Sequence, residues 1–300
     1  MPSIDGIVNI HKPAGMTSHD VVARVRRVLQ TKRVGHAGTL DPDATGVLVV
    51  AVGQATRLLP HLPLEPKMYI ARAVFGSATT SEDASGTETE SADASALTEE
   101  ALSAAIPPFI GDIQQIPPMV SAVHHEGKRL YELARAGITV EREARAARIF
   151  DIRLTDFTPG ERAEATLHVS CGSGTYIRTL CADMGKSVGL PAHMRTLVRT
   201  AVGRFTLENA VEWETLTPSA LVPMEVALDF PTVRLTDEAA SDILMGRSIV
   251  IAPTLFDGSG TIDVMLLHSN RLLSLAHLDT ETGTAQPFKV FPLQGEGKND

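Results

Sequence analysis

The spacing of hydrophobic residues along the chain predicts a mixture of strands and helices. A valine-rich run of strand length occupies residues 47–52, and between residues 18 and 29 valine and leucine recur on one helical face. Thr17 or Ser18 can cap that helix, because a side-chain hydroxyl accepts a hydrogen bond from a free backbone N–H group. Similar signals predict strands at 6–10, 69–75, 166–171 and 197–207, and helices from Thr175 towards Gly189 and at 236–244.

The composition changes near residue 230, which predicts a second domain. A chain of 300 residues exceeds the size at which a single hydrophobic core usually stops growing. The last seventy residues contain only five of the 27 basic residues and show one helix among several short strands. We therefore expect an α+β protein with a larger domain at 1–230 and a small β-rich domain at 231–300.

The net charge of −9 is concentrated in one segment. Residues 73–127 contain no lysine or arginine but nine of the 36 acidic residues, so the rest of the chain has 27 residues of each sign. Basic residues cluster at 24–33 and at 128–148. The total charge alone would argue against RNA as a partner, but the charge distribution does not. We expect RNA on the basic side of the protein, with the acidic segment turned away from it.

The sequence lacks the common signatures of metal, cofactor and hydrolase sites. Its ten histidines and two cysteines show no zinc-type spacing, and no phosphate-binding P-loop or complete G-x-G-x-x-G occurs. A G-x-S-x-G nucleophile elbow is also absent. We therefore expect a protein that uses no metal and no cofactor.

The same survey predicts a cytoplasmic protein without a membrane partner. Cys171 and Cys181 are too few for a disulfide framework in a chain of this size, and we expect both to be inert buried thiols. No signal peptide is visible at the start of the chain. The longest apolar stretch, 47–52, is far too short to cross a bilayer.

The loop around Asp41 is the strongest candidate for chemistry. It is rich in small residues, and Gly35, Gly38 and Gly46 would let the backbone approach a ligand closely. His36 lies five residues before the carboxylate, and the valine-rich strand that follows would hold the loop rigidly. An Asp–Pro pair also favours a tight turn, so a purely structural Asx hydrogen bond is the alternative interpretation.

This loop and four further motifs resemble the bacterial TruB family of tRNA pseudouridine synthases. The loop sequence Gly35-His36-Ala37-Gly38-Thr39-Leu40-Asp41-Pro42, with Ala44-Thr45-Gly46, is similar to the family's catalytic signature. The other matching motifs are Lys12-Pro13-x-Gly15-Met16-x-Ser18, Lys67-x-Tyr69, a thumb-like stretch from Gly111 to Gly137, and Gly174-Thr175-Tyr176-Ile177-Arg178 with Ala192-His193 through Leu197. Five motifs in the family's order make the resemblance specific.

The resemblance implies a fold and an activity. The implied pseudouridine synthase fold has a mixed, mostly antiparallel central sheet with flanking helices and a basic thumb-like insertion at about 117–148. The implied reaction is the isomerisation of uridine 55 in the T-arm of tRNA, without a cofactor. The last seventy residues resemble a PUA-type RNA-binding domain.

The resemblance also implies a role for individual residues. Asp41 would be the catalytic carboxylate, acting either as a nucleophile at C1′ of the ribose or as a base that removes a sugar proton. Tyr69 would stack on the target uracil, and Arg178 would pair with Asp41. The other implied substrate-binding residues are Tyr176 and Leu197, which would line the pocket, and His36, which would fill the space that the flipped base leaves.

The chain departs from the family pattern at Val198, where the family more often has a second arginine, so no phosphate contact is expected there. Two other classes of protein remain open. An RNA-binding or RNA-folding module could hold a flipped base without needing Asp41, and a glycosidase-like enzyme would need a second carboxylate, for which only Asp43 is close. We expect a monomer that acts on the T-arm stem-loop of tRNA without an obligate protein partner.

Overall fold

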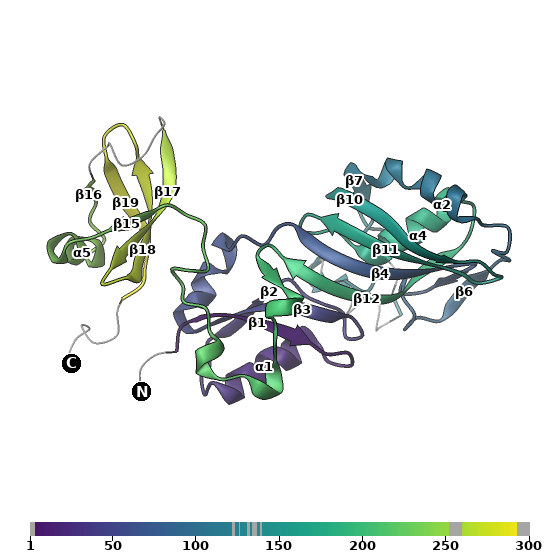
Figure 1. Ribbon diagram of the computed structural model, residues 1–300, viewed down its shortest axis with the longest axis horizontal. Coiled ribbons are helices and arrows are strands. Elements are labelled where there is room, and N and C mark those ends of the chain that lie inside the picture. Colours follow the sequence, from purple (N-terminus) through teal and green to yellow (C-terminus); the bar gives the residue numbers. More distant parts are fainter. Residues whose placement is uncertain are drawn as a thin grey trace.

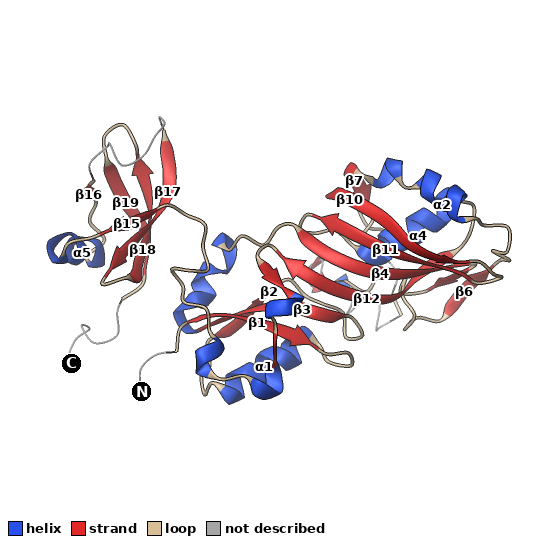
Figure 2. Cartoon of the chain, viewed as in Figure 1, coloured by secondary structure: helices blue, strands red, loops and turns tan. Residues whose placement is uncertain are grey.

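A computed structural model describes residues 4–121, 124–125, 127–130, 133, 137–138, 140–251 and 260–292. The molecule is elongated, with a larger part built on a long curved sheet and a smaller part formed by residues after 230 (Figure 1). Strands dominate both parts, and the helices lie mostly at the edges and faces of the sheets (Figure 2).

The larger part is organised by a ten-stranded sheet among the described residues. Its order is β14-β1-β3-β12-β4-β11-β10-β7, with β2 beside β3 and β13 beside β12. These strands are β1 (Gly6–Lys12), β2 (Val34–Ala37), β3 (Thr45–Val52), β4 (Lys67–Phe75), β7 (Gly111–Gln115), β10 (Arg145–Thr158), β11 (Ala163–Cys171), β12 (Ala192–Val202), β13 (Phe205–Thr206) and β14 (Val211–Glu212). Neighbours are antiparallel except for β1 with β14 and β3 with β12. The predicted mixed, mostly antiparallel sheet is confirmed.

The parallel junction between β3 and β12 joins the two halves of this sheet beside the Asp41 loop. Thr45 and Gly46 pair there with Val198 and Arg199. Gly46 has a φ of +107°, and a β-carbon at this position would lie 2.1 Å from the carbonyl oxygen of Arg199. Since only glycine tolerates both conditions, the missing side chain is what lets the two halves meet.

Both faces of the β1–β3 half are covered. The helix α1 (Ser18–Val28) packs Val21, Val22 and Val25 against one face, and the 3-10 helix η1 (Gly53–His61) packs against the other. Thr17 is the cap of α1, because its hydroxyl accepts a hydrogen bond from the backbone N–H of Asp20 at 3.1 Å.

The β4–β12 half is covered on one face only. The helices α2 (Glu99–Ala105) and α4 (Ile177–Ser187) contribute to a buried cluster with β4, β11 and β12. Along β4 the buried Tyr69 and Ala71 alternate with Met68 and Arg72, which are exposed on the opposite face. The covered face is therefore the one towards which Tyr69 points.

Short elements connect these layers. They are β5 (Ser77–Thr79), β6 (Glu88–Ser91), η2 (Pro107–Phe109), β8 (His124–His125), β9 (Lys128–Arg129), η3 (Leu207–Asn209), η4 (Trp213–Thr215) and η5 (Pro218–Ala220).

The smaller part is a five-stranded sheet with one helix in its described residues. Its elements are β15 (Thr232–Arg234), α5 (Asp237–Leu244), β16 (Ile249–Val250), β17 (Thr261–His268), β18 (Arg271–Asp279) and β19 (Thr284–Val290). This agrees with the β-rich region expected after residue 230, whereas its PUA-type character remains a prediction.

The smaller part packs directly on η1. Arg57 donates a hydrogen bond to the carbonyl oxygen of Val290 at 2.7 Å, and Lys289 donates to the carbonyl oxygen of Arg57 at 3.0 Å. Buried apolar side chains from both parts, including Leu58 and Leu275, belong to one cluster. The two parts therefore share a hydrophobic core at this contact.

Several local expectations are corrected by the structure. Residues 34–37, expected in a loop, form β2 because they pair with β3. The strand expected over 197–207 ends at Val202, where a turn at Gly203 leads into β13. The helix expected from Thr175, α4, starts after Tyr176, and the Thr175 hydroxyl donates to the carbonyl oxygen of Gly172 at 3.1 Å.

The thumb-like insertion expected at about 117–148 lies partly outside the described residues. From Arg145 onward the range belongs to β10 of the central sheet. Within the described part of the chain, the structure shows no helix with the length and apolar character needed to cross a membrane.

The close approach at Gly46 predicts a large effect of a single added methyl group. In Gly46→Ala the positive φ costs about 1–2 kcal/mol and the overlap with Arg199 about 1–3 kcal/mol more. We expect thermal unfolding, followed by the fluorescence of the single tryptophan, Trp213, to shift down by at least several degrees.

Gly189→Ala is the matched control, because Gly189 also has a positive φ of +73° but open space around it. Equal losses of stability in the two variants would show that the contact with β12 does not constrain residue 46.

Candidate active site

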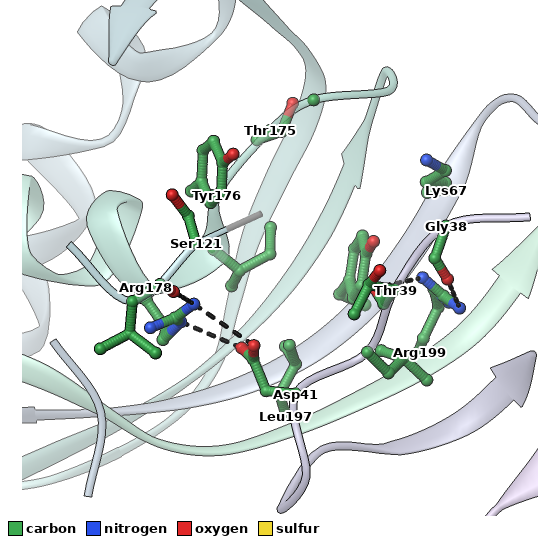
Figure 3. A pocket seen from close by; sticks show the side chains of 15 residues that line it. Gly38, Thr39, Asp41, Lys67, Ser121, Thr175, Tyr176, Arg178, Leu197 and Arg199 are labelled. Carbon is green, nitrogen blue, oxygen red and sulfur yellow. Dashed lines mark hydrogen bonds and ion pairs between the residues drawn. The ribbon is translucent and has the colours of Figure 1, made fainter. Parts of the chain in front are cut away.

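A pocket of about 270 Å³ lies at the N-terminal end of α4, where β4, β12 and the loop after β2 converge (Figure 3). Of the six residues predicted for the site, five line this pocket: Asp41, Tyr69, Tyr176, Arg178 and Leu197. They come from four segments that are far apart in the sequence, and the fold brings them together.

The alternation of side chains along two neighbouring strands selects which residues face the pocket. Tyr69 on β4 is the cross-strand partner of Arg199 on β12, and both line the pocket together with Leu197. Val198 lies between Leu197 and Arg199 and therefore points to the opposite face of the sheet. The departure from the family pattern at Val198 thus lies away from the pocket.

The Asp41 loop is fixed by its neighbours before it meets any ligand. The Ser18 hydroxyl accepts a hydrogen bond from the backbone N–H of Leu40 at 2.9 Å and donates to the carbonyl oxygen of the same residue at 3.2 Å. The carbonyl oxygen of Asp41 accepts from the N–H of Ala44 at 3.1 Å. The backbone therefore makes the expected turn, and the carboxylate of Asp41 remains available for other partners.

The carboxylate of Asp41 is paired with Arg178 through two contacts. Nε of Arg178 lies 3.0 Å from Oδ2, and Nη2 donates to Oδ1 at 3.3 Å (Figure 3). The guanidinium is 5% exposed, whereas the carboxylate is 34% exposed and opens towards the pocket. At about 4 Å and an effective dielectric constant of 20, such a pair gains roughly 4 kcal/mol before the cost of desolvation is subtracted. The arrangement holds the carboxylate in place while leaving part of it accessible.

Arg178 is itself held by three further groups. Its Nη1 donates to the carbonyl oxygen of Ser81 at 3.0 Å and lies 3.5 Å from Oδ2 of Asp83. Its Nη2 donates to the carbonyl oxygen of Val120 at 2.8 Å. A guanidinium has five N–H donors in a fixed plane, and here they connect the pocket to two segments that precede α4 by more than fifty residues.

The contact with Ser81 and Asp83 corrects the expectation that the acidic segment turns away from the RNA side. Both residues belong to that segment, and Glu82 between them accepts a hydrogen bond from the Thr179 hydroxyl at 2.6 Å. The physical reason is that a buried arginine needs compensating charge and acceptors, and these acids supply part of both. Part of the acidic excess is therefore used inside the site.

The surroundings of Asp41 shift the pKa of its carboxyl group upwards. Burial, the largest cause, raises the pKa, and the nearby carboxylates Asp83 and Asp43 add to that effect. The positive charges of Arg178 and Lys12 oppose it by favouring the ionised form. Asp41 is thus a carboxylate whose protonation depends on the balance between burial and two cations.

Tyr176 is positioned through its backbone by Gln115 at the end of β7. The Nε2 atom of Gln115 donates to the carbonyl oxygen of Tyr176 at 3.1 Å, and Oε1 accepts from the N–H of Tyr176 at 2.9 Å. Gln115 is only 2% exposed. Its amide therefore pairs with both backbone groups of Tyr176, as a neighbouring β-strand would, and fixes the position of this residue before α4.

His36 is the one predicted site residue that the structure does not place in the pocket lining. It lies in β2, where its ring is 5.7 Å from the ring of His19 in an edge-to-face arrangement. Burial lowers the pKa of its imidazole, and its Nδ1 atom is buried with no hydrogen-bond partner in the described structure. Its predicted contact with the space left by a flipped base stays a prediction.

Sequence reasoning missed two buried cations beside the Asp41 loop. Lys12 is fully buried and donates to the carbonyl oxygens of Pro13 and Pro42 at 2.8 and 2.9 Å, and burial lowers its pKa to about 8. Arg199 is 1% exposed and donates to the carbonyl oxygens of Gly38 in the loop and of Val47 in β3. Lys12 stands within a motif of the sequence and Arg199 lies two residues beyond one, but neither position indicated that the partners would be backbone carbonyls.

The described residues contain no group of three or more histidine, cysteine or acidic side chains arranged to bind a metal ion. Burial raises the pKa of Cys171 to about 11 and that of Cys181 to about 12, as expected for unreactive thiols. The pocket therefore presents one partly exposed carboxylate beside a fixed guanidinium, two tyrosines and an aliphatic wall. Such a site can bind a flat, partly polar ring and offer it, or an attached sugar, a carboxylate.

Two family models together match residues 26–229 of the chain. Residues 26–177 match the model described as "TruB family pseudouridylate synthase (N terminal domain)". Residues 178–229 match the model described as "tRNA pseudouridylate synthase B C-terminal domain". Together the two matches run through the residues that form the pocket.

Curated relatives agree with these matches. The chain is 43% identical over 295 residues to a tRNA pseudouridine synthase B from Thermobifida fusca, covering 96% of this chain and 98% of that protein. It is 47% identical over 246 residues to the protein of the same name from Symbiobacterium thermophilum, covering 81% and 82%.

Solved structures show the same fold. One chain in a crystal structure of a Cbf5-Nop10-Gar1 complex is 26% identical, with a TM-score of 0.66, and the match covers 96% of this chain and 84% of that one. A chain in an H/ACA RNP bound to a substrate RNA containing 2′-deoxyuridine has a TM-score of 0.69 at 24% identity and supports the fold alone, over 96% and 86% of the two chains.

The clamp on Tyr176 predicts that Gln115→Glu destabilises the protein. An ionised carboxylate would face the carbonyl oxygen of Tyr176, to which the native amide donates, so a buried acceptor would lose its partner. We expect the free energy of unfolding in urea to fall by about 1–3 kcal/mol. Gln114→Glu on the same strand is the control, because Gln114 is exposed. Indistinguishable unfolding of the two variants would contradict this role of Gln115.

Proposed function

Since the chain belongs to the TruB family and is a tRNA pseudouridine synthase, we propose that its substrate is uridine 55 in the T-arm of tRNA and that Asp41 is the catalytic residue. The observation that carries the proposal is the bidentate pair between Arg178 and the partly exposed carboxylate of Asp41 at the bottom of the pocket. The carboxylate is accessible and its orientation is fixed, and catalysis at a sugar–base bond needs both.

The reaction moves the ribose from N1 to C5 of the same uracil. The C1′–N1 bond breaks, the C1′–C5 bond forms, the proton on C5 is lost to solvent and N1 gains a proton, so no electrons enter or leave. Asp41 can serve this isomerisation in two ways: its carboxylate attacks C1′ and forms a transient ester, or it removes a proton from the sugar so that the base can leave. Both routes require Asp41 to be ionised, and Arg178 favours that form.

The target base has to leave its stack in the RNA before it can enter the pocket. This unstacking costs a few kcal/mol, and stacking on an aromatic ring recovers roughly 1–3 kcal/mol. The place of Tyr69 in the pocket lining, with 8% of the residue exposed, supports this role for it. Tyr176 and Leu197 would complete the wall around the base.

The basic residues of α1 and the turn after it would hold the tRNA backbone. Arg24, Arg26, Arg27, Lys32 and Arg33 follow the helix start that Ser18 ties to Leu40 in the Asp41 loop. A cluster of positive charges attracts the phosphate backbone of RNA. We propose that the chain works as a monomer, in the cytoplasm and without an obligate protein partner.

The proposal predicts that Asp41→Asn abolishes the reaction and preserves binding. The amide keeps the shape of the carboxylate but can act neither as a nucleophile nor as a base. With a T-arm stem-loop that carries 5-tritiated uridine, the wild type should release tritium at the position of uridine 55, and Asp41→Asn should release none above background. A filter-binding measurement with the same RNA should give dissociation constants within about threefold of each other.

Tritium release by Asp41→Asn at the wild-type rate would remove Asp41 from catalysis. If the wild type itself released no tritium but still bound the stem-loop, the chain would be an RNA-binding module for this RNA. A stem-loop in which cytidine replaces uridine 55 controls for release from any other position.

The raised pKa of Asp41 predicts the pH dependence of the rate. Because the ionised form is the active one, the single-turnover rate should rise with pH, with a midpoint above 3.8, the ordinary value for an aspartate. Asp43→Asn removes a negative charge that raises this pKa, so its midpoint should move to lower pH while the plateau rate is unchanged. Loss of activity in Asp43→Asn would favour a mechanism with two carboxylates, and Trp213 fluorescence at each pH would detect acid unfolding.

A further inference from the structure

Arg199 is the largest of the fully buried side chains in the described structure, and its charge has no carboxylate within ion-pairing distance among the described residues. Its guanidinium donates instead to backbone carbonyl oxygens: Nε to Val47 at 2.8 Å, Nη2 to Gly38 at 3.1 Å and Nη1 to Thr39 at 3.4 Å. Burying a cation against neutral acceptors is costly, so a position like this calls for a specific explanation.

The three acceptors lie on both sides of Asp41. Gly38 and Thr39 precede the aspartate, and Val47 follows it in β3, so the guanidinium bridges the two ends of the loop. Figure 3 shows the Arg199 side chain reaching Gly38 from the strand that also carries Leu197. Since Ser18 holds Leu40 and Lys12 holds Pro42, Arg199 completes a set of contacts to the three residues before Asp41 and the one after it.

Arg199 also lies opposite Tyr69, the residue predicted to stack on the target base. It is the cross-strand partner of Tyr69 on β4. Burial, the largest cause, raises the pKa of the Tyr69 hydroxyl, whereas the Arg199 charge acts to lower that pKa. One side chain therefore binds the loop that carries the carboxylate and lies opposite the tyrosine expected to stack on the base.

The shape of the contacts requires a guanidinium. Three nitrogen atoms of the planar guanidinium donate to three different carbonyl oxygens. A lysine has only one nitrogen atom, so it could not make all three of these contacts. The second anchor, Lys12, holds a different carbonyl and cannot substitute for it.

We infer that Arg199 is a positioning residue for the proposed isomerisation: its guanidinium sets the distance between the Asp41 carboxylate and a base stacked on Tyr69. This inference rests on the proposed function and adds a residue that does not touch the reacting atoms. Small displacements of a catalytic group lower the rate steeply, by on the order of 100-fold for about 1 Å, whereas binding depends on contacts spread over the RNA. The rate should therefore depend on Arg199 and the affinity should not.

The test is Arg199→Lys, with Arg195→Lys as the matched control on the same strand. Arg195 is exposed and pairs with Glu164 at the surface, so its replacement by lysine should leave the rate unchanged. Single-turnover tritium release is measured with saturating enzyme and the T-arm stem-loop, and the rate is divided by the folded fraction from circular dichroism. For Arg199→Lys we expect a rate per folded molecule that is 10- to 100-fold lower, with an RNA dissociation constant within about threefold of the wild type.

A purely structural role would give a different result. If the rate per folded Arg199→Lys molecule equalled that of the wild type, or if affinity fell as much as the rate, the inference would be overturned. Arg199→Gln, which keeps donors but no charge, is the second variant, and failure of both variants to fold would assign Arg199 to folding instead. The proposed function is tested separately by the wild type. If the wild type releases no tritium, the proposed substrate and the role of Asp41 fail. If the wild type and the Arg199 variant release tritium equally, only the inference about Arg199 fails.

Discussion

The ion pair between Arg178 and Asp41 is the interaction on which the rest of the site depends. One guanidinium, 5% exposed, gathers the Asp41 loop, the acidic segment at Ser81 and Asp83 and the chain at Val120 around the start of α4. These segments present to it one carboxylate from each of Asp41 and Asp83 and backbone carbonyl oxygens from Ser81 and Val120, all of which are polar groups that need partners when buried. The cost of burying Arg178 is offset only if all of its neighbours are in place, so the pocket forms as a unit.

The loop that carries Asp41 is rigid for a related reason. Its backbone carbonyls are held by Arg199 and Lys12, and its amide at Leu40 is held by Ser18. Electrostatic catalysis is most effective when the groups that stabilise charge are oriented before the substrate arrives. The acidic segment then has a structural task within the site, which explains part of its charge but not its whole length.

Elements with a regular hydrophobic spacing could be predicted from the sequence, whereas contacts between residues distant in the sequence could not. Strands such as β3 and the helices α1 and α5 follow from hydrophobic spacing, and the five pocket residues follow from motifs. The strand β2 and the role of Asp83 could not be predicted, because both depend on partners distant in sequence. The buried contacts of Arg199 could not be predicted for the same reason. Every residue has a backbone carbonyl, so residue types do not indicate which carbonyls bind the guanidinium. His36 carries the family motif but lies outside the pocket lining, since a motif records identity rather than orientation.

The packing of the small C-terminal part on η1 has a consequence for how the two parts could cooperate. A domain on a flexible linker adds affinity through an effective concentration that depends on linker length. Here Leu58 and Leu275 share one buried cluster, Arg57 donates a hydrogen bond to the carbonyl oxygen of Val290, and Lys289 donates one to the carbonyl oxygen of Arg57, so the spacing between the two parts is fixed by their shared core. Any surface that the small part offers to a substrate therefore stands at a fixed distance from the pocket. An RNA that contacts both parts would have to match that distance.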